Sequence, residues 1–153
     1  GGKVLQVVHT SLPAATFSTT STSFTDITGM TVAITPAATS SKVLLEVIIN
    51  YDMGSTTSFA AFKALRDTTD LAVGASASSR VQCAAWGSSY DNQSITHRSM
   101  TFLDSPSSTS SLTYKMQVNL DGSTFYLNRA ATDTNNTSFG RVISTMTATE
   151  IGA

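Results

Sequence analysis

The chain has 153 residues, of which 12% are charged and 41% apolar, and its net charge at pH 7 is −1. This length fits one domain with its own hydrophobic core, and the apolar residues spread along the chain argue against disorder. The near-neutral charge gives no electrostatic reason to expect nucleic acid or membrane as a partner, and no apolar run is long enough to cross a bilayer. The single cysteine, Cys83, excludes an internal disulfide and predicts a buried thiol.

The N-terminal third of the chain predicts strands around one apolar segment. We expect the first strand over Lys3–His9, a hydroxyl-rich edge strand or loop over 16–25, and a turn at Asp26–Gly29. Met30–Ile34 then alternates strictly between apolar and polar residues. Lys42–Tyr51 is the most continuously apolar run, is rich in Val and Ile, and contains no Gly or Pro. This composition predicts a central strand covered on both faces.

The middle of the chain predicts shorter strands separated by polar loops. Ser58–Asp67 fits either a strand or a short helix, and we favour the strand because Asp67–Asp70 is typical of a hairpin turn into Leu71–Val73. Further strands are expected over 81–86 and 94–103.

The last third contains the clearest alternation. Leu112, Tyr114, Met116, Val118 and Leu120 share one parity, which predicts that they point into the core. Asp121-Gly122 predicts a hairpin into 123–129, and 141–151 predicts the last strand. Together these segments predict a single all-β domain over 1–153. We expect an antiparallel β-sandwich, jelly-roll-like, with roughly eight to ten strands.

The chain offers no recognisable catalytic or metal-binding motif. Both histidines, His9 and His97, fall in expected strands, and no serine sits in a nucleophile elbow. The only glutamates, Glu46 and Glu150, are also in expected strands, and the aspartates fall in turns, where they form local hydrogen bonds. Asp133–Asn136 lacks the ligand spacing of a calcium loop. We therefore expect no enzyme activity, no metal and no cofactor.

Three aromatic residues are candidates for stacking on a sugar ring: Tyr51, Trp86 and Tyr90. For Trp86, core packing is favoured over a ligand platform. Tyr90 lies in a small polar loop and is the better candidate for an exposed contact.

A set of short phrases follows one another along nearly the whole chain. They are Gly2–Val8, Phe17–Phe24, Ile34–Pro36, Ser40–Leu44, Phe102–Pro106, Thr113–Lys115, Tyr126–Arg129, Gly140–Arg141 and Thr147–Ile151. In this order they resemble a domain that recurs in tail-fibre and other virion structural proteins of tailed bacteriophages, especially marine ones.

The resemblance implies a virion surface module, commonly trimeric and commonly at the end of a fibre. We therefore expect a homotrimer that contacts other virion proteins and binds a glycan or protein of the bacterial surface. The chain enters a strand directly after Gly1-Gly2, which is expected of a domain cut from a longer protein or of one that carries the remnant of a tag. We favour the C-terminal head of a longer fibre protein. The alternatives are a capsid decoration or cement domain, a polysaccharide-degrading enzyme, and a cellular lectin-like or cytokine-like sandwich.

In such domains the framework recurs and the loops differ, so the loops are where specificity is expected. Here these loops are Gly54–Ser58, Gly74–Ser79, Gly87–Asn92 and Ala130–Gly140. The candidate receptor-binding residues are Trp86, Tyr90, Asn92, Asp133, Asn135 and Asn136.

Overall fold

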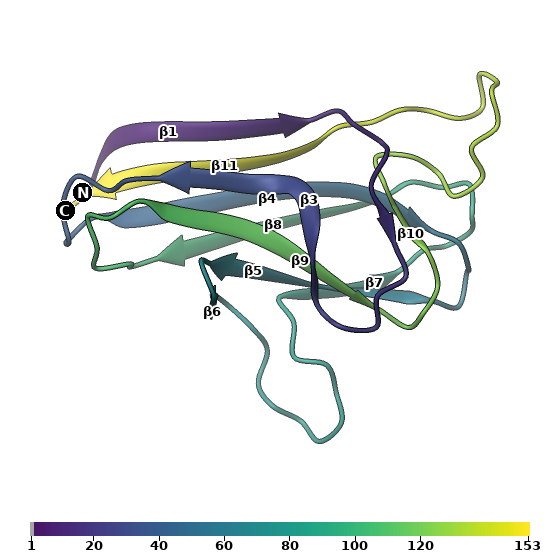
Figure 1. Ribbon diagram of the computed structural model, residues 1–153, viewed down its shortest axis with the longest axis horizontal. Coiled ribbons are helices and arrows are strands. Elements are labelled where there is room, and N and C mark those ends of the chain that lie inside the picture. Colours follow the sequence, from purple (N-terminus) through teal and green to yellow (C-terminus); the bar gives the residue numbers. More distant parts are fainter. Residues whose placement is uncertain (1) are drawn as a thin grey trace.

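The computed structural model describes residues 2–153 as two antiparallel β-sheets packed face to face (Figure 1). The described residues form eleven strands and no helix. This confirms the predicted all-β sandwich. Gly1, part of the expected domain start, lies outside the described residues. No helix long and apolar enough to span a membrane occurs in residues 2–153.

Sheet A contains the organising strand. In this sheet β4 pairs with β11 on one edge and with β8 on the other, and β1 pairs with the far edge of β11. Beyond the end of β11, β10 takes over the same edge of β4 and in turn pairs with β2. The strands of sheet A are β1 (Lys3–Leu12), β2 (Ser18–Thr19), β4 (Lys42–Met53), β8 (Thr96–Asp104), β10 (Phe125–Leu127) and β11 (Ser144–Gly152).

Sheet B has β9 and β5 at its centre. β9 lies between β3 and β5, and the other edge of β5 carries both β7 and β6. The jelly-roll subtype stays a prediction, supported by the strand order β1-β11-β4-β8 in one sheet and β3-β9-β5-β7 in the other. The strands of sheet B are β3 (Thr25–Ile34), β5 (Phe59–Arg66), β6 (Thr69–Asp70), β7 (Ala85–Ser88) and β9 (Leu112–Leu120).

The core lies between the inner faces of the two sheets. The alternating residues of β9 are all buried as predicted, and those of β4 face them from sheet A. Three aromatic rings fill the end of the core near the loops: Tyr51 stacks on Phe125 at 5.2 Å and meets Phe62 edge-on at 5.2 Å. The inward residues of β4 are Val43, Leu45, Val47, Ile49 and Tyr51.

β4 is central but not covered on both faces. Its outward residues Leu44, Glu46 and Ile48 lie on the free face of sheet A, and Ile48 is 38% exposed. The prediction of burial on both faces was wrong, because none of residues 2–153 covers that face of β4. The strand buried on both sides is instead β5, where consecutive residues Ala60, Ala61 and Phe62 are inaccessible to solvent.

One predicted turn lies inside a strand, and one predicted hairpin does not form. Asp26–Gly29 lies inside β3, where the pairing with β9 shifts register between Asp26 and Thr31. Gly29 has a φ of 88°, which the irregular strand requires and glycine adopts without strain. Asp121-Gly122 does not close a hairpin, because Phe125–Leu127 pairs with β4 and β2 and not with β9. The chain crosses from one sheet to the other at this point.

The hairpin predicted after β5 is confirmed at its turn but not beyond it. Arg66 pairs with Thr69 across the two residues Asp67 and Thr68. Leu71–Val73 then leaves the sheet, so the expected strand there is wrong.

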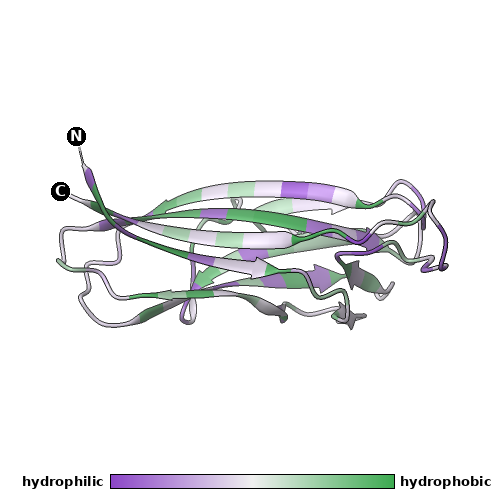
Figure 2. Ribbon diagram, turned by 90° about the horizontal axis from the view of Figure 1, so that it is seen from above, coloured by the Kyte–Doolittle hydropathy of each residue, from purple (hydrophilic) through white to green (hydrophobic). Residues whose placement is uncertain are grey.

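The two ends of the sandwich differ. Both described chain ends lie at one end, and most of the long connections lie at the opposite end, which we call the loop end (Figure 1). Figure 2 shows apolar and polar stretches alternating along the long strands and strongly hydrophilic residues in the loops at the loop end. The segment 71–84 lies apart from both ends and projects from the flank of sheet B (Figure 1).

Candidate functional site

Three of the four loops predicted to carry specificity meet at the loop end. These are 54–58, 87–92 and 130–140 (Figure 1). The last two are joined directly, because the backbone N–H of Thr132 donates to the carbonyl of Asn92 at 2.8 Å. The fourth, 74–79, lies on the flank and is not part of this group.

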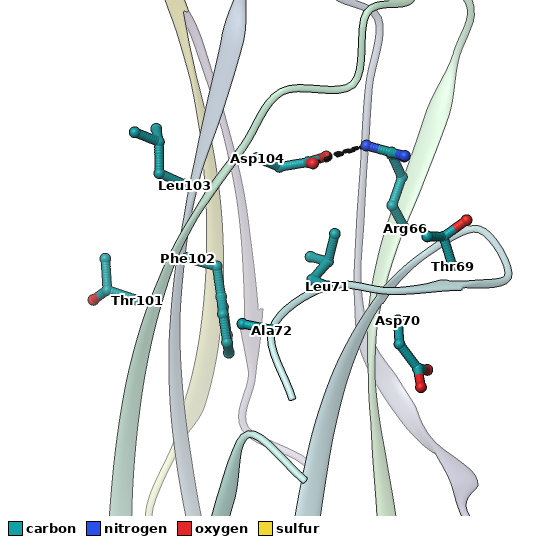
Figure 3. Close-up of a pocket in the computed structure, with 9 residues that line it drawn as sticks. All are labelled: Arg66, Thr69, Asp70, Leu71, Ala72, Thr101, Phe102, Leu103 and Asp104. Carbon is teal, nitrogen blue, oxygen red and sulfur yellow. Dashed lines mark hydrogen bonds and ion pairs between the residues drawn. The ribbon is translucent and has the colours of Figure 1, made fainter. Parts of the chain in front are cut away.

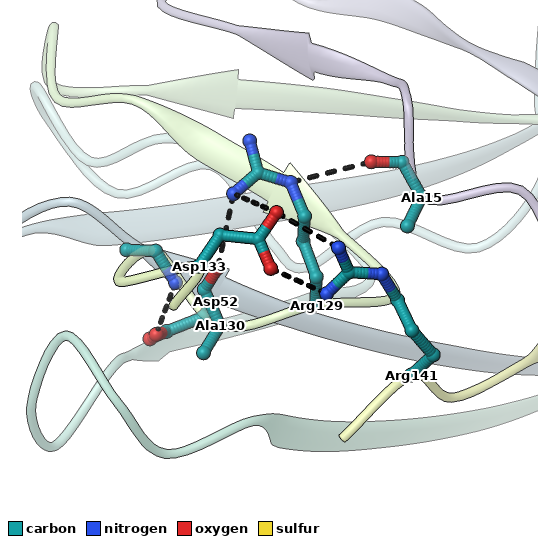
Figure 4. A network of polar contacts seen from close by, with 7 residues as sticks. Ala15, Asp52, Arg129, Ala130, Asp133 and Arg141 are labelled. Carbon is teal, nitrogen blue, oxygen red and sulfur yellow. Dashed lines mark hydrogen bonds and ion pairs between the residues drawn. The ribbon is translucent and has the colours of Figure 1, made fainter. Parts of the chain in front are cut away.

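Asp52, at the end of β4, anchors these loops from below (Figure 4). Its buried carboxylate accepts hydrogen bonds from the backbone N–H of Met53 at 2.7 Å, from that of Ala131 at 2.8 Å and from the Ser89 hydroxyl. One side chain therefore fixes the starts of two loops that are about forty residues apart in sequence. Sequence reasoning missed this role, since an aspartate after an apolar strand is ordinarily a turn residue.

Replacing Asp52 with Ala is expected to loosen the loop end. The backbone N–H of Ala131 would lose its acceptor, whereas the Ser89 hydroxyl keeps the carbonyl of Asp91 as a second acceptor at 2.7 Å. An unsatisfied buried polar group costs about 1–3 kcal/mol. We expect lower thermal stability and faster amide exchange at Ala131, with β9 amides unchanged. Unchanged exchange at Ala131 would show that Asp52 does not hold the loop.

Asp133 lies between two arginines above this anchor (Figure 4). Arg141 binds its carboxylate with both terminal nitrogens, at 2.5 and 2.8 Å, and Nη1 of Arg129 lies 3.8 Å away. The hydrogen bond from Arg141 lowers the pKa of Asp133 below its ordinary value. Arg129 also donates to the carbonyl of Ala15 at 3.3 Å and stacks over the Tyr126 ring at 4.2 Å. These contacts hold the root of the loop in place.

A shallow hollow of about 340 Å³ opens beside this ion pair. It brings together three of the predicted site residues, which were chosen only because they share a polar loop. Its lining combines a carboxylate, two primary amides, a hydroxyl, a guanidinium and one aromatic ring. Such groups can accept from and donate to the hydroxyls of a sugar while the ring covers an apolar face. The lining residues are Asp133, Thr134, Asn135, Asn136, Phe139 and Arg141.

The remaining predicted residues lie outside this hollow. Tyr90 is 89% exposed, which confirms its predicted exposure, and Asn92 is exposed in the same loop. Trp86 is 59% exposed and stacks on Phe59 at 5.8 Å, so the favoured core placement was wrong. It points outward because its neighbour in β7, Gly87, faces the interior. Tyr51 is buried, so it is not available for sugar stacking.

Sequence reasoning missed Thr134, Phe139 and Arg141 as members of the hollow. Phe139 and Arg141 belong to the end of the polar segment 130–141, where Arg141 pairs with Arg129 in an isolated β-bridge. The only usable signal was an aromatic residue inside an otherwise polar loop.

A second groove, of about 310 Å³, opens between the sheets at the edge formed by β6 and β8 (Figure 3). Its charged groups at one end are satisfied by one another: Arg66 binds Asp104 at 2.6 Å, and the Tyr114 hydroxyl donates to Asp104 at 2.7 Å. Asp104, predicted to be a turn residue, is the last residue of β8. The ion pair closes this edge of the sandwich, so we assign the groove a structural role.

Both histidines lie in strands, as predicted. Nδ1 of His97 is 3.0 Å from Oδ1 of Asn50, and Nδ1 of His9 is 2.8 Å from Oγ1 of Thr147. Within residues 2–153, no group of three or more His, Cys, Asp or Glu side chains is placed to hold a metal ion. No protein-family model matches the chain, and no curated protein matches it.

Proposed function

We propose that this domain is a surface module of the virion of a tailed bacteriophage, a homotrimeric fibre tip that binds a receptor on the host cell. The starting point is the ordered set of phrases that resembles tail-fibre domains. The observation that carries the proposal is the clustering of three polar loops at the end of the sandwich opposite the described chain ends (Figure 1). A domain attached to a fibre at its terminal end would direct these loops toward the cell.

The receptor chemistry that fits the loop end is a glycan. The hollow beside Asp133 is small and lined mainly by hydrogen-bonding groups, with Phe139 as the one aromatic surface. Asp52 and the Arg129–Asp133–Arg141 contacts hold the lining in place before binding, which reduces the entropy lost when a ligand binds.

The free face of sheet A is the surface best suited to contact between copies of this chain in a homotrimer. It is formed by the outward residues of four adjacent strands, and only Lys42 and Glu46 among them carry a full charge. One row across the four strands is almost entirely apolar: Val7, Thr149, Leu44 and Leu103. The outward residues are Val4, Val7, His9 and Ser11 on β1, Thr145, Thr147, Thr149 and Ile151 on β11, Lys42, Leu44, Glu46, Ile48 and Asn50 on β4, and His97, Ser99, Thr101 and Leu103 on β8.

The free face of sheet B has the opposite character. Lys63 binds Asp70 at 2.7 Å and Lys115 binds Asp26 at 2.8 Å on this face. Charged pairs of this kind favour contact with water, whereas a large uncharged face favours burial. A closed homotrimer would therefore bury sheet A around its axis and leave sheet B outside.

The receptor proposal is tested by binding of the labelled domain to marine bacterial isolates and to their extracted surface polysaccharides. The double substitution Asn135→Ala with Phe139→Ala removes an amide and the ring from the hollow without touching its ion pair. We expect binding to fall at least tenfold, or about 1.4 kcal/mol. The control, Thr109→Ala, lies in the exposed loop at the other end of the sandwich and should bind like the original chain.

Two results would contradict the receptor proposal. Binding that is unchanged in the double variant would remove the hollow as the receptor site. Failure of the domain to bind any isolate or polysaccharide would remove receptor binding itself and favour a decoration or cement role in the virion.

A further inference from the structure

The flank of sheet B carries a second hollow, of about 430 Å³, separate from the hollow beside Asp133. β5 and β7 supply Phe59 and Trp86, and the segment 71–84 supplies the opposite wall. The lining is almost entirely apolar apart from one guanidinium. The lining residues are Phe59, Arg80, Val81, Cys83 and Trp86.

The wall of this hollow is fixed by backbone hydrogen bonds. The N–H of Leu71 donates to the carbonyl of Ala64 at 2.9 Å, and that of Ala84 donates to the carbonyl of Phe62 at 2.7 Å. Within the segment, the N–H of Gly74 donates to the carbonyl of Cys83 at 3.0 Å. Both ends of the segment are thus tied to β5 and to each other, so the hollow exists before any ligand arrives. Compact, closed loops of this kind are frequently functional.

Trp86 forms an aromatic platform at this site. Its indole stacks on the Phe59 ring at 5.8 Å with an angle of 23° between the planes, and more than half of its surface remains in contact with solvent. Cys83 is half-buried beside it, which corrects the fully buried thiol expected from the sequence. Burial raises the pKa of the Cys83 thiol, as expected for an apolar surrounding. A rigid aromatic face with an apolar wall suits the C–H face of a sugar ring.

The charge at the hollow is positive. Arg80 is the only charged residue of the segment 71–84 and is exposed at the rim. Among the ion pairs of the described residues none involves Arg80, and no carboxylate lines the hollow. A guanidinium without a partner favours a carboxylate or another anionic group on the ligand.

We propose that this flank hollow binds an acidic saccharide, with the sugar ring on Trp86 and the sugar carboxylate on Arg80. The site is separate from the hollow at the loop end and gives the domain a second contact with an acidic polysaccharide. Its biological role rests on the proposed receptor function, but the binding itself is a property of the purified domain.

The test uses the fact that Trp86 is the only tryptophan, so its fluorescence reports on this site alone. The probes are oligogalacturonate, oligomannuronate and an oligomer of N-acetylneuraminate, with methyl-esterified oligogalacturonate as the neutral match. We expect at least one acidic probe to change the Trp86 emission saturably, with binding that weakens as salt is added. The methyl ester should bind at least tenfold more weakly than the acid.

Three substitutions test the charge of Arg80, the specificity of that charge and the Trp86 ring. Arg80→Gln keeps the fluorescent reporter and is expected to weaken acidic-probe binding at least tenfold. Lys3→Gln changes the net charge equally at the opposite end of the molecule and should leave binding unchanged. Trp86→Ala, followed by calorimetry, should abolish binding.

The proposal is overturned if none of the three acidic probes changes the emission at millimolar concentration, or if Arg80→Gln binds like the original chain. These results are distinguishable from failure of the receptor proposal. A domain that binds acidic probes at Trp86 but no bacterial cell keeps this site and loses the receptor role. A domain that binds cells but no acidic probe does the reverse.

Discussion

Met116→Asp is expected to destabilise the domain by more than about 3 kcal/mol, a large part of the roughly 5–15 kcal/mol that holds an ordinary domain folded. Met116 lies in the middle of β9, is inaccessible to solvent and belongs to the main core cluster. An aspartate there would place an unpaired charge among apolar side chains and leave part of the methionine volume empty. Urea unfolding followed by circular dichroism measures the loss. If the variant does not fold, Met116→Ala keeps the test measurable, with an expected cost of about 2–5 kcal/mol.

The control needs an exposed position in the same sheet. Alternation alone would choose Gln117, the next residue. However, the Gln117 amide donates to Oδ1 of Asp26 at 2.7 Å, and hydrogen bonds from Lys115 and then Gln117 lower the pKa of Asp26. An aspartate at 117 would therefore face a second carboxylate. Ala33 is exposed on β3 and makes no such contact, so Ala33→Asp should be nearly neutral. Equal melting temperatures for Met116→Asp and Ala33→Asp would show that the inward face of β9 is assigned wrongly.

The sequence predicts this sandwich well wherever one face of a strand is buried and the other is wet. β9 follows strict alternation because its inward residues meet the core and its outward residues meet solvent or Asp26. The same pattern is less informative for β4, where apolar residues on both parities predicted burial on both sides. Among residues 2–153 only the inward side of β4 is buried. Apolar residues on the outward side of a strand do not show whether the same chain covers them.

Long-range pairing was the least predictable part of the fold. Asp121-Gly122 has the residues of a tight hairpin, yet the chain there crosses to sheet A, since β4 offers Phe125–Leu127 a free edge beyond the end of β11. Gly29 falls in the turn that the sequence predicts, because a bulge inside a strand and a turn both favour glycine with positive φ. Local composition does not distinguish these cases.

Some residues of the candidate sites could be predicted from the sequence and others could not. Asp133, Asn135 and Asn136 could be grouped from sequence because one polar loop carries all three. The contribution of Asp52 could not, since its partners Ser89 and Ala131 come from two other segments. Trp86 was misplaced because a lone tryptophan in an apolar run is ordinarily a core residue, and only the parity of β7 shows that it faces outward.

The free face of sheet A leads to the second large expected effect. We expect light scattering at micromolar concentration to give a mass three times the 16.0 kDa of one chain. Val7→Lys and Leu103→Lys should each reduce the mass to that of a monomer. Both side chains are 58% exposed in the single chain and lie at opposite ends of the apolar row across sheet A. A lysine at either position therefore costs little in a monomer, but it would be buried without a partner inside the proposed trimer.

The matched control is Ala33→Lys, which adds the same charge to the outer face of sheet B and should leave the trimer intact. Circular dichroism of all three variants should match the original chain, because none of the substituted side chains lies in the core. A mass of 16.0 kDa for the original chain would remove the trimer altogether. A trimer that survives both sheet A substitutions but is lost with Ala33→Lys would place the contact on sheet B, and the charged pairs of that face would then have to lie within the interface.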